Sequence, residues 1–280
     1  MIGGLWFWSG PISLLFVSLA VSWLSEYNLQ QFLVFALVLT RVSGLAMTAP
    51  IYGASEIPMQ IRALIAFALA VLIVPTQLGA HFPNPHTLVD LVLILGGELL
   101  IGLTLGLGIM ILFSGIQLTG QIIGQVSGMS LADVFNPSFD TTIPLLSQML
   151  YMFSLAIYVM AGGHRLLMAG LLDTFATIPP GMGTLSTSLG DASITLLMQS
   201  FDLGIRAAAP AIVALLVATL VLGLISRTLP QLNVMAVGFG INATFTFITL
   251  SVSLGAIAWI FQAEIEPALD TLFEALHGSG

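Results

Sequence analysis

A few ionisable side chains interrupt long apolar runs, and chemistry would depend on them. Glu98 follows Gly96 and Gly97 in aliphatic surroundings. An ionised carboxylate in such a place is costly, and it tends to find a cation, a polar seam or water. A proton relay is the functional interpretation of Glu98. Because a lone carboxylate at the end of a span is more often a boundary residue, we expect that second role.

The other ionisable residues indicate pairing and no catalysis. Asp202 and Arg206 stand four positions apart, which predicts an ion pair along one helix. The four histidines have no second ligand at metal spacing, and the chain contains no cysteine. Phosphate loops, dinucleotide fingerprints, the HExxH pattern and the Gly-x-Ser-x-Gly elbow are absent from the sequence. We therefore expect a protein without enzymatic activity, cofactor or metal.

Glycines and glutamines alternate at a spacing of four in one segment. On a single helix they would place a groove of small residues beside a row of amides. Small residues let another backbone approach closely, and amides can hydrogen-bond across the contact. Packing within the chain is the simpler interpretation, but three glutamines in a row with three glycines favour a partner helix or a wetted lumen. The residues are Gln117, Gly120, Gln121, Gly124, Gln125 and Gly128. Gly102 and Gly106 repeat the spacing upstream without polar companions, and there we expect simple helix packing.

The composition excludes a water-soluble globule. Hydrophobic residues make up 58% of the 280 positions and charged residues 6%, with a mean hydropathy of +1.08. Soluble domains carry about 25% charged residues. The chain is therefore an integral membrane protein or is buried in a larger assembly. The net charge is -8, and all five basic residues are arginines, so the sequence offers no basic patch for nucleic acid.

Charge-free stretches predict an all-α, polytopic membrane bundle with helices that Gly and Pro interrupt. A span needs roughly 20 apolar residues, and we expect about five to seven spanning helices in one domain, 1–280. Residues 1–30 are a candidate additional N-terminal helix. Residues 262–280 form an acidic amphipathic helix or tail, either solvated or available for docking. Further uncharged stretches of about spanning length or more are 63–80, 99–132, 141–163, 207–226 and 228–263.

Read in order, the interruptions resemble the FliR/SpaR family, the R-type inner-membrane subunit of type III export gates. The similarity covers about residues 35–261, the family-like core. Its most specific pieces are GGHRLLMAGLLDTF at 162–175 and RTLPQLNV at 227–234, after RVSGLAMTAP at 41–50. The positions that carry it are Arg41, Pro50, Pro58, Arg62, Gly162, Gly163, Asp173, Arg227, Pro230, Gln231 and Asn233.

This resemblance implies a structural and gating subunit of the flagellar protein-export gate in the bacterial inner membrane, within the flagellar basal body. Such a subunit joins FliP-type and FliQ-type subunits in a closed helical hetero-oligomer that exports unfolded flagellar proteins. FlhB-type and FlhA-type export proteins are further expected partners. A secondary transporter with broken helices near Pro210 or Pro230 is the alternative. Transporters usually contain internal repeats, and this sequence has none.

The resemblance also implies a plug-like loop that helps to close the pore. Bulky apolar side chains at a constriction exclude water and ions, and glycine-flanked loops can swing aside. By position this loop comprises Met129, Ser130, Val134, Phe135, Asn136, Pro137 and Phe139. The sequence departs from the family where Gly240 and Asn242 replace a usual Pro and Lys, so no role of that lysine carries over.

Overall fold

The computed structural model describes residues 11–53, 57–77, 85–129, 144–183, 187–228 and 234–277. The regular elements in these ranges are all α-helices, which confirms the predicted fold class. In chain order they are α1 (Pro11–Thr48), α2 (Met59–Gln77), α3 (Leu88–Val126), α5 (Leu145–Met160), α6 (Gly163–Thr177), α7 (Thr187–Thr228) and α8 (Val234–His277).

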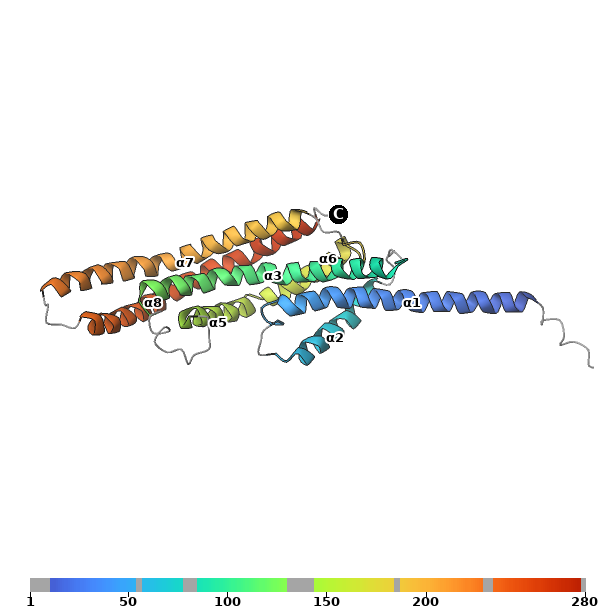
Figure 1. Ribbon diagram of the computed structural model, residues 1–280, viewed down its shortest axis with the longest axis horizontal. Coiled ribbons are helices and arrows are strands. Elements are labelled where there is room, and N and C mark those ends of the chain that lie inside the picture. Colours follow the sequence, from blue (N-terminus) through green and yellow to red (C-terminus); the bar gives the residue numbers. More distant parts are fainter. Residues whose placement is uncertain are drawn as a thin grey trace, which may run out of the picture.

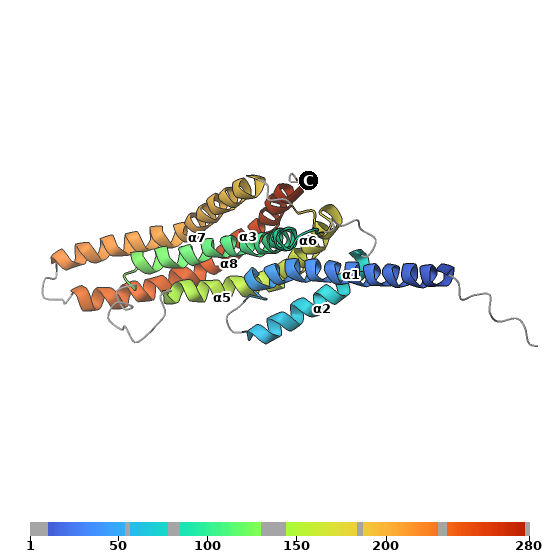
Figure 2. The ribbon, with the colours of Figure 1, turned by 45° about the vertical axis from the view of Figure 1, so that its right-hand side comes forward.

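Helix α3 lies at the centre of an elongated bundle (Figure 1). It packs against α1, α5, α7 and α8, while α2 packs against α1. Helices α7 and α8 run side by side along most of their length in both views (Figures 1 and 2). The candidate additional N-terminal helix is, from Pro11 on, the first half of α1. The acidic C-terminal helix is the last part of α8.

Local sequence signals set the ends of α3 and the bend between α5 and α6. Thr87 and Asp90 form a capping box: Asp90 N donates to Thr87 Oγ1 over 3.1 Å, and Thr87 N donates to Asp90 Oδ2 over 3.0 Å. Gly128 follows the helix with φ +74°, a left-handed conformation that terminates helices. Gly162, with φ +77°, lies between α5 and α6, whose axes differ in direction by 65°.

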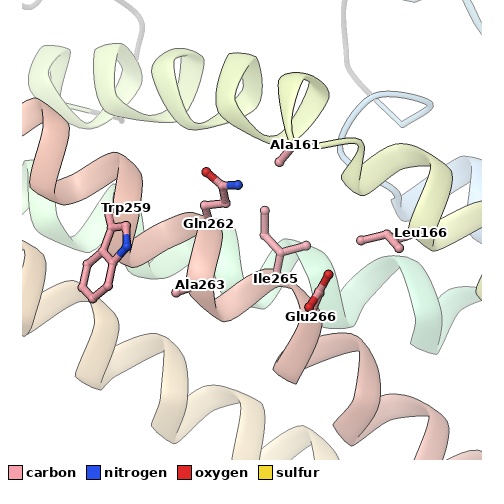
Figure 3. A pocket seen from close by; sticks show the side chains of 7 residues that line it. All are labelled: Ala161, Leu166, Trp259, Gln262, Ala263, Ile265 and Glu266. Atoms are coloured by element: carbon pink, nitrogen blue, oxygen red, sulfur yellow. The ribbon is translucent and has the colours of Figure 1, made fainter.

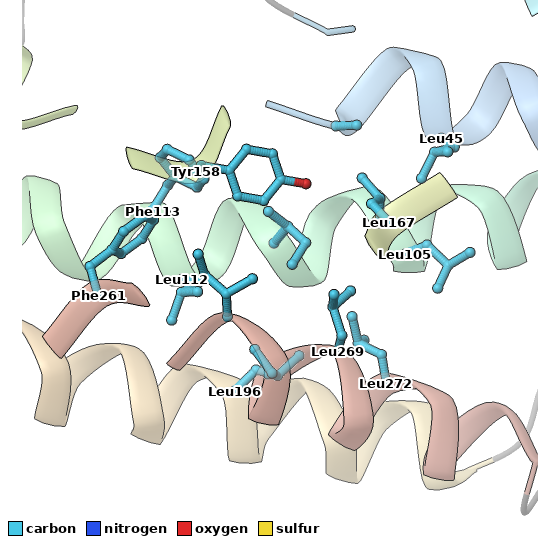
Figure 4. Packing of buried hydrophobic residues seen from close by; sticks show 14 of the residues in the cluster. Leu45, Leu105, Leu112, Phe113, Tyr158, Leu167, Leu196, Phe261, Leu269 and Leu272 are labelled. Atoms are coloured by element: carbon cyan, nitrogen blue, oxygen red, sulfur yellow. The ribbon is translucent and has the colours of Figure 1, made fainter. Parts of the chain in front are cut away.

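Aromatic and aliphatic side chains of α1, α3, α5, α6, α7 and α8 fill the interior (Figure 4). Phe113 of α3 is at its centre, with ring centroids 5.5 Å from Tyr151, 5.5 Å from Tyr158 and 5.1 Å from Phe261. All three contacts are edge-to-face, the arrangement that the ring quadrupoles favour. These contacts fix α5 and α8 against the middle of α3.

Five described helices are long and apolar enough to cross a membrane, or up to six spans if the bent pair α5 and α6 counts as one. This number agrees with the expected range. Much of the apolar surface faces outward: Leu64 and Leu72 of α2 are 66% and 72% exposed, and α7 carries a long exposed apolar face. The chain therefore buries part of its apolar residues internally and offers the rest to lipid or to protein.

Candidate functional site

A fully buried ion pair joins α1 to α3. Arg41 and Glu98 both have 0% exposed side chains. Arg41 Nε donates to Glu98 Oε2 over 2.6 Å, and Arg41 Nη2 donates to Glu98 Oε1 over 3.1 Å. This two-point contact is the strongest form of an arginine–carboxylate interaction. The cation that a buried Glu98 requires is thus supplied within the chain.

The same pair also holds α6 and the segment that follows it. Arg41 Nη1 donates to Thr174 O over 3.0 Å and to Thr174 Oγ1 over 3.2 Å, and Arg41 Nη2 donates to Ile178 O over 3.0 Å. Gly181 N donates to Glu98 Oε1 over 2.7 Å. We call Arg41, Glu98, Thr174, Ile178 and Gly181 the ion network. Because the two charges are paired and accept or donate further hydrogen bonds, these contacts offset the desolvation penalty of burying them.

Glycines on the facing surfaces of α1 and α3 bring the ion network together. A Cβ added to Gly44 would lie 2.6 Å from Leu99 O, so the two backbones cross in direct contact. Gly102 and Gly106 of α3 abut the α1 backbone at Leu45 and Ala49, respectively. The prediction that Gly102 and Gly106 serve helix packing is confirmed.

The expected boundary role of Glu98 is wrong. Its side chain points into the bundle, where α1 supplies the arginine that neutralises it. Arg41 was visible in the sequence as the charge that breaks an apolar run, but nothing in its spacing identified Glu98 as its partner. The signal that could have identified the pair is that Arg41 and Glu98 are each a lone charge in an aliphatic run. Burying two opposite charges costs less free energy when they contact each other.

The predicted pair of Asp202 and Arg206 is confirmed and has a third member. Arg206 Nη2 lies 2.6 Å from Asp202 Oδ2 and 2.8 Å from Glu264 Oε1 of α8. We call these three residues the charged triad. Unlike the ion network, it is at the surface: the Asp202 and Arg206 side chains are 61% and 51% exposed. It ties α7 to the acidic part of α8.

The glycine and glutamine pattern is divided between an internal contact and an open amide row. A Cβ added to Gly120 would lie 2.5 Å from Ser147 Cα, so α5 crosses α3 closely at this point. Ser147 Oγ donates to Gln117 O over 2.9 Å. Gly124 has looser surroundings, with Leu146 Cδ1 at 3.8 Å from such a Cβ. Gly128 lies beyond the end of α3 and so outside the single helix that the spacing predicted.

The amides of Gln117, Gln121 and Gln125 have no hydrogen-bond partner among the residues that the structure describes, and Gln125 is exposed. The helix-packing half of the interpretation therefore applies to Gly120. The lumen or partner contact of the amides stays a prediction.

Only the first residue of the predicted plug-like loop, Met129, is described. Its backbone N–H donates to Ser127 Oγ over 3.4 Å. The segment begins just after the left-handed Gly128, and the described chain resumes at Pro144, which precedes α5. Packing of Gly120 against Ser147 thus fixes α3 and α5 near both ends of this segment. The other predicted plug residues, Ser130, Val134, Phe135, Asn136, Pro137 and Phe139, fall outside the described residues.

Most positions that carry the family resemblance shape turns and contacts. Pro58 precedes α2, and its carbonyl accepts from Ile61 N over 2.9 Å. Arg62 Nε donates to Ile57 O over 3.0 Å. Pro50 lies in the turn after α1, Asp173 is exposed on α6, and Arg227 lies in the last turn of α7. Pro230, Gln231 and Asn233 are outside the described residues.

The glycine pair at the bend has two different tasks. Gly162 adopts the left-handed conformation that starts the turn into α6. Gly163 faces the ring of Tyr158, which leaves no room for a side chain. Arg165 lies beside Gly162, with Nη2 at 3.1 Å from a Cβ built there. Both glycines are therefore required by the geometry of the bend.

A cleft of about 290 Å³ opens between this bend and α8 (Figure 3). Ala161 and Leu166 line one side, and Trp259, Gln262 and Glu266 of α8 line the other. The lining holds one carboxylate and one amide but no nucleophile. Among the described residues, no group of three or more metal-ligating side chains exists. This arrangement does not identify a reaction.

Sequence comparison decides the family. The family described as "Bacterial export proteins, family 1" matches residues 32–268. The chain belongs to this bacterial export family. With its five candidate spans, this member of the family is an integral membrane protein. Gly240 and Asn242, the two residues that depart from the family resemblance, lie in α8. The Asn242 Oδ1 atom is buried there without a hydrogen-bond partner among the described residues.

Individual relatives carry a more specific name. The chain is 29% identical to the "Flagellar biosynthetic protein FliR" of Caulobacter vibrioides over 240 residues, covering 86% of this chain and 96% of the relative. The Escherichia coli protein of the same name is 31% identical over 222 residues, 79% and 82% of the two chains. The Bacillus subtilis protein of that name is 29% identical over 250 residues, covering 85% and 92%.

Proposed function

We propose that the chain is a structural and gating subunit of the flagellar type III protein-export gate. It forms, with FliP-type and FliQ-type subunits in the bacterial inner membrane, the channel through which unfolded flagellar proteins leave the cytoplasm. FlhB-type and FlhA-type proteins dock on this assembly in the flagellar basal body. In this role the chain catalyses no reaction and needs no cofactor. The export family and the names of its flagellar relatives support this proposal.

The observation that carries the proposal is the length of the helices. Helices α3, α7 and α8 contain 39, 42 and 44 residues. At 1.5 Å per residue they are about 58 to 66 Å long, twice the roughly 30 Å of a hydrocarbon core. Apolar helices of this length cannot be covered by lipid alone. They favour a subunit whose exposed faces are enclosed by other subunits, partly outside the bilayer.

The open amides of α3 support a gating role. The side-chain amides of Gln117, Gln121 and Gln125 find no partner in the described chain, although they lie on a mainly apolar helix. Amides of this kind are tolerable where they meet another subunit or a water-filled lumen. They also lie on the part of α3 that leads directly into the segment proposed as the plug. Apolar residues of that segment would close the lumen while the gate is at rest.

The test replaces Val134, Phe135 and Phe139 together with serine in the complete complex. We expect ion conductance of membranes that contain the closed complex to rise, because the apolar barrier is removed. A matched control changes Leu64 and Leu72, exposed on α2, to serine and should leave conductance at its original level. Unaltered conductance of a fully assembled variant complex, also after deletion of residues 130–140, would refute the gating role.

A further inference from the structure

Helix α7 has a second apolar face that no part of the described chain covers. One face packs against α3 and α8. On the other, Ile194, Met198, Phe201 and Ile205 are 53%, 67%, 58% and 56% exposed. We call these four residues the outer seam. Their spacing of four, three and four is the heptad spacing by which one helix receives the side chains of another.

Hydrocarbon does not account for the outer seam. Exposed large apolar residues continue along α7 from Ile194 to Ile225, which is about 46 Å at 1.5 Å per residue. A hydrocarbon core of about 30 Å covers only two thirds of that length. The uncharged stretch 207–226 is about 30 Å long, which matches the thickness of one hydrocarbon core. Arg206 comes directly before it and marks the boundary with the charged part of α7. The outer seam, on the charged side of this stretch, therefore lies beyond the hydrocarbon.

The charged triad lies beside the outer seam and carries a net charge of one negative unit. Arg206 is shared between Asp202 and Glu264, at 2.6 Å and 2.8 Å. Asp202 is directly next to Phe201 and is 61% exposed, so a second cation can reach it. An interface over Phe201 would bury this carboxylate, and a buried carboxylate requires compensation. A partner that covers the outer seam must therefore bring a positive charge.

A second copy of this chain is poorly suited to supply that charge. The chain has no lysine and a net charge of -8, and two of its five arginines, Arg41 and Arg206, are already held in the ion network and the charged triad. The other three lie outside the outer seam: Arg62 on α2, Arg165 on α6 and Arg227 in the last turn of α7. Two copies joined along this face would place acidic residues of α7 and α8 against each other, which opposes association. A basic position on a different chain fits better.

We propose that the outer seam is the docking surface for a helix of a different membrane subunit, with apolar residues at heptad spacing and a Lys or Arg opposite Asp202. This inference rests on the proposed function, because it names the surface by which the subunit joins the gate. The apolar contact supplies the association, and the cation opposite Asp202 fixes the register of the two helices.

The absence of cysteine allows a direct test in the complete complex. Met198→Cys and Phe201→Cys each introduce a single thiol into the outer seam, to which a benzophenone maleimide is attached. Leu220→Cys, 69% exposed in the uncharged part of α7, is the matched control. Upon illumination, we expect both seam positions to crosslink to one other subunit, several-fold more than the control. Mass spectrometry of the crosslinked peptide identifies the partner helix.

A second variant tests the charge independently of the crosslink. Asp202→Lys should lower the yield of assembled complex about tenfold, since a cation would then face the partner's cation. Asp202→Asn should lower it less, and exchanging the partner's Lys or Arg for Asp should restore assembly of Asp202→Lys. Crosslinks to a second copy, or none in an intact complex, would overturn this inference alone. Failure of the unmodified chain to assemble with any other subunit would overturn the proposed function and this inference together.

Discussion

Removing either member of the buried ion pair should destabilise the protein strongly. Glu98→Ala deletes a carboxylate that accepts two hydrogen bonds from Arg41 and one from Gly181 N. It leaves the Arg41 guanidinium without a counter-charge at a position with 0% exposure. Breaking such a buried pair typically costs about 3 to 5 kcal/mol. Arg41→Leu should cost a similar amount, because it leaves Glu98 charged and Ile178 O without its donor.

The double variant separates pairing from simple loss of packing. Arg41→Met with Glu98→Leu removes both charges at once and leaves mainly Gly181 N and Ile178 O without partners. Each unpaired buried backbone group costs about 1 to 3 kcal/mol. The double variant should therefore be less destabilised than the two single variants combined, by at least about 2 kcal/mol of coupling.

The assay is equilibrium unfolding of the purified chain in mixed detergent micelles, followed by the fluorescence of its four tryptophans. Asp202→Asn is the matched control, because it also removes one carboxylate from an ion pair but at a site that is 61% exposed. Exposed pairs contribute about 0 to 1 kcal/mol. The reasoning is refuted if Glu98→Ala costs no more than this control, or if the two single effects simply add in the double variant.

The remaining predictions concern the glycines, each measured by the same unfolding assay. Gly102→Leu should prevent α1 and α3 from packing and leave little folded protein, whereas Gly96→Leu, with open space around its Cβ position, should be tolerated; equal folded yields would contradict this. Gly120→Leu should be far more damaging than Gly124→Ala, because only Gly120 abuts the α5 backbone. Gly162→Ala should cost about 1 kcal/mol or more, owing to its φ of +77°; an unchanged stability would show that the bend does not depend on that conformation.

The sequence predicted what depends on neighbours along the chain. The all-α class and the number of spans followed from charge-free runs, and the Asp202–Arg206 pair followed from the periodicity of a helix. Gly102 and Gly106 were also interpreted correctly as packing residues. All of these are properties of one helix or of a composition, which a sequence displays directly.

The sequence did not predict contacts between distant helices. Arg41 and Glu98 are separated by 57 positions, and their meeting depends on the register in which Gly44 and Gly102 let α1 cross α3. Glu264 joined the triad for the same reason, since α8 had to be placed beside α7 first. The misplaced boundary role of Glu98 shows that a single carboxylate in an apolar run needs its three-dimensional partner before it can be interpreted.

The most direct test of the central claim weighs the assembled particle. The chain is expressed with FliP-type and FliQ-type subunits of its own organism, purified in mild detergent and analysed by native mass spectrometry. We predict one copy of this chain bound to several copies of two smaller hydrophobic chains. A stable lone monomer or homodimer under the same conditions would contradict the export-gate account.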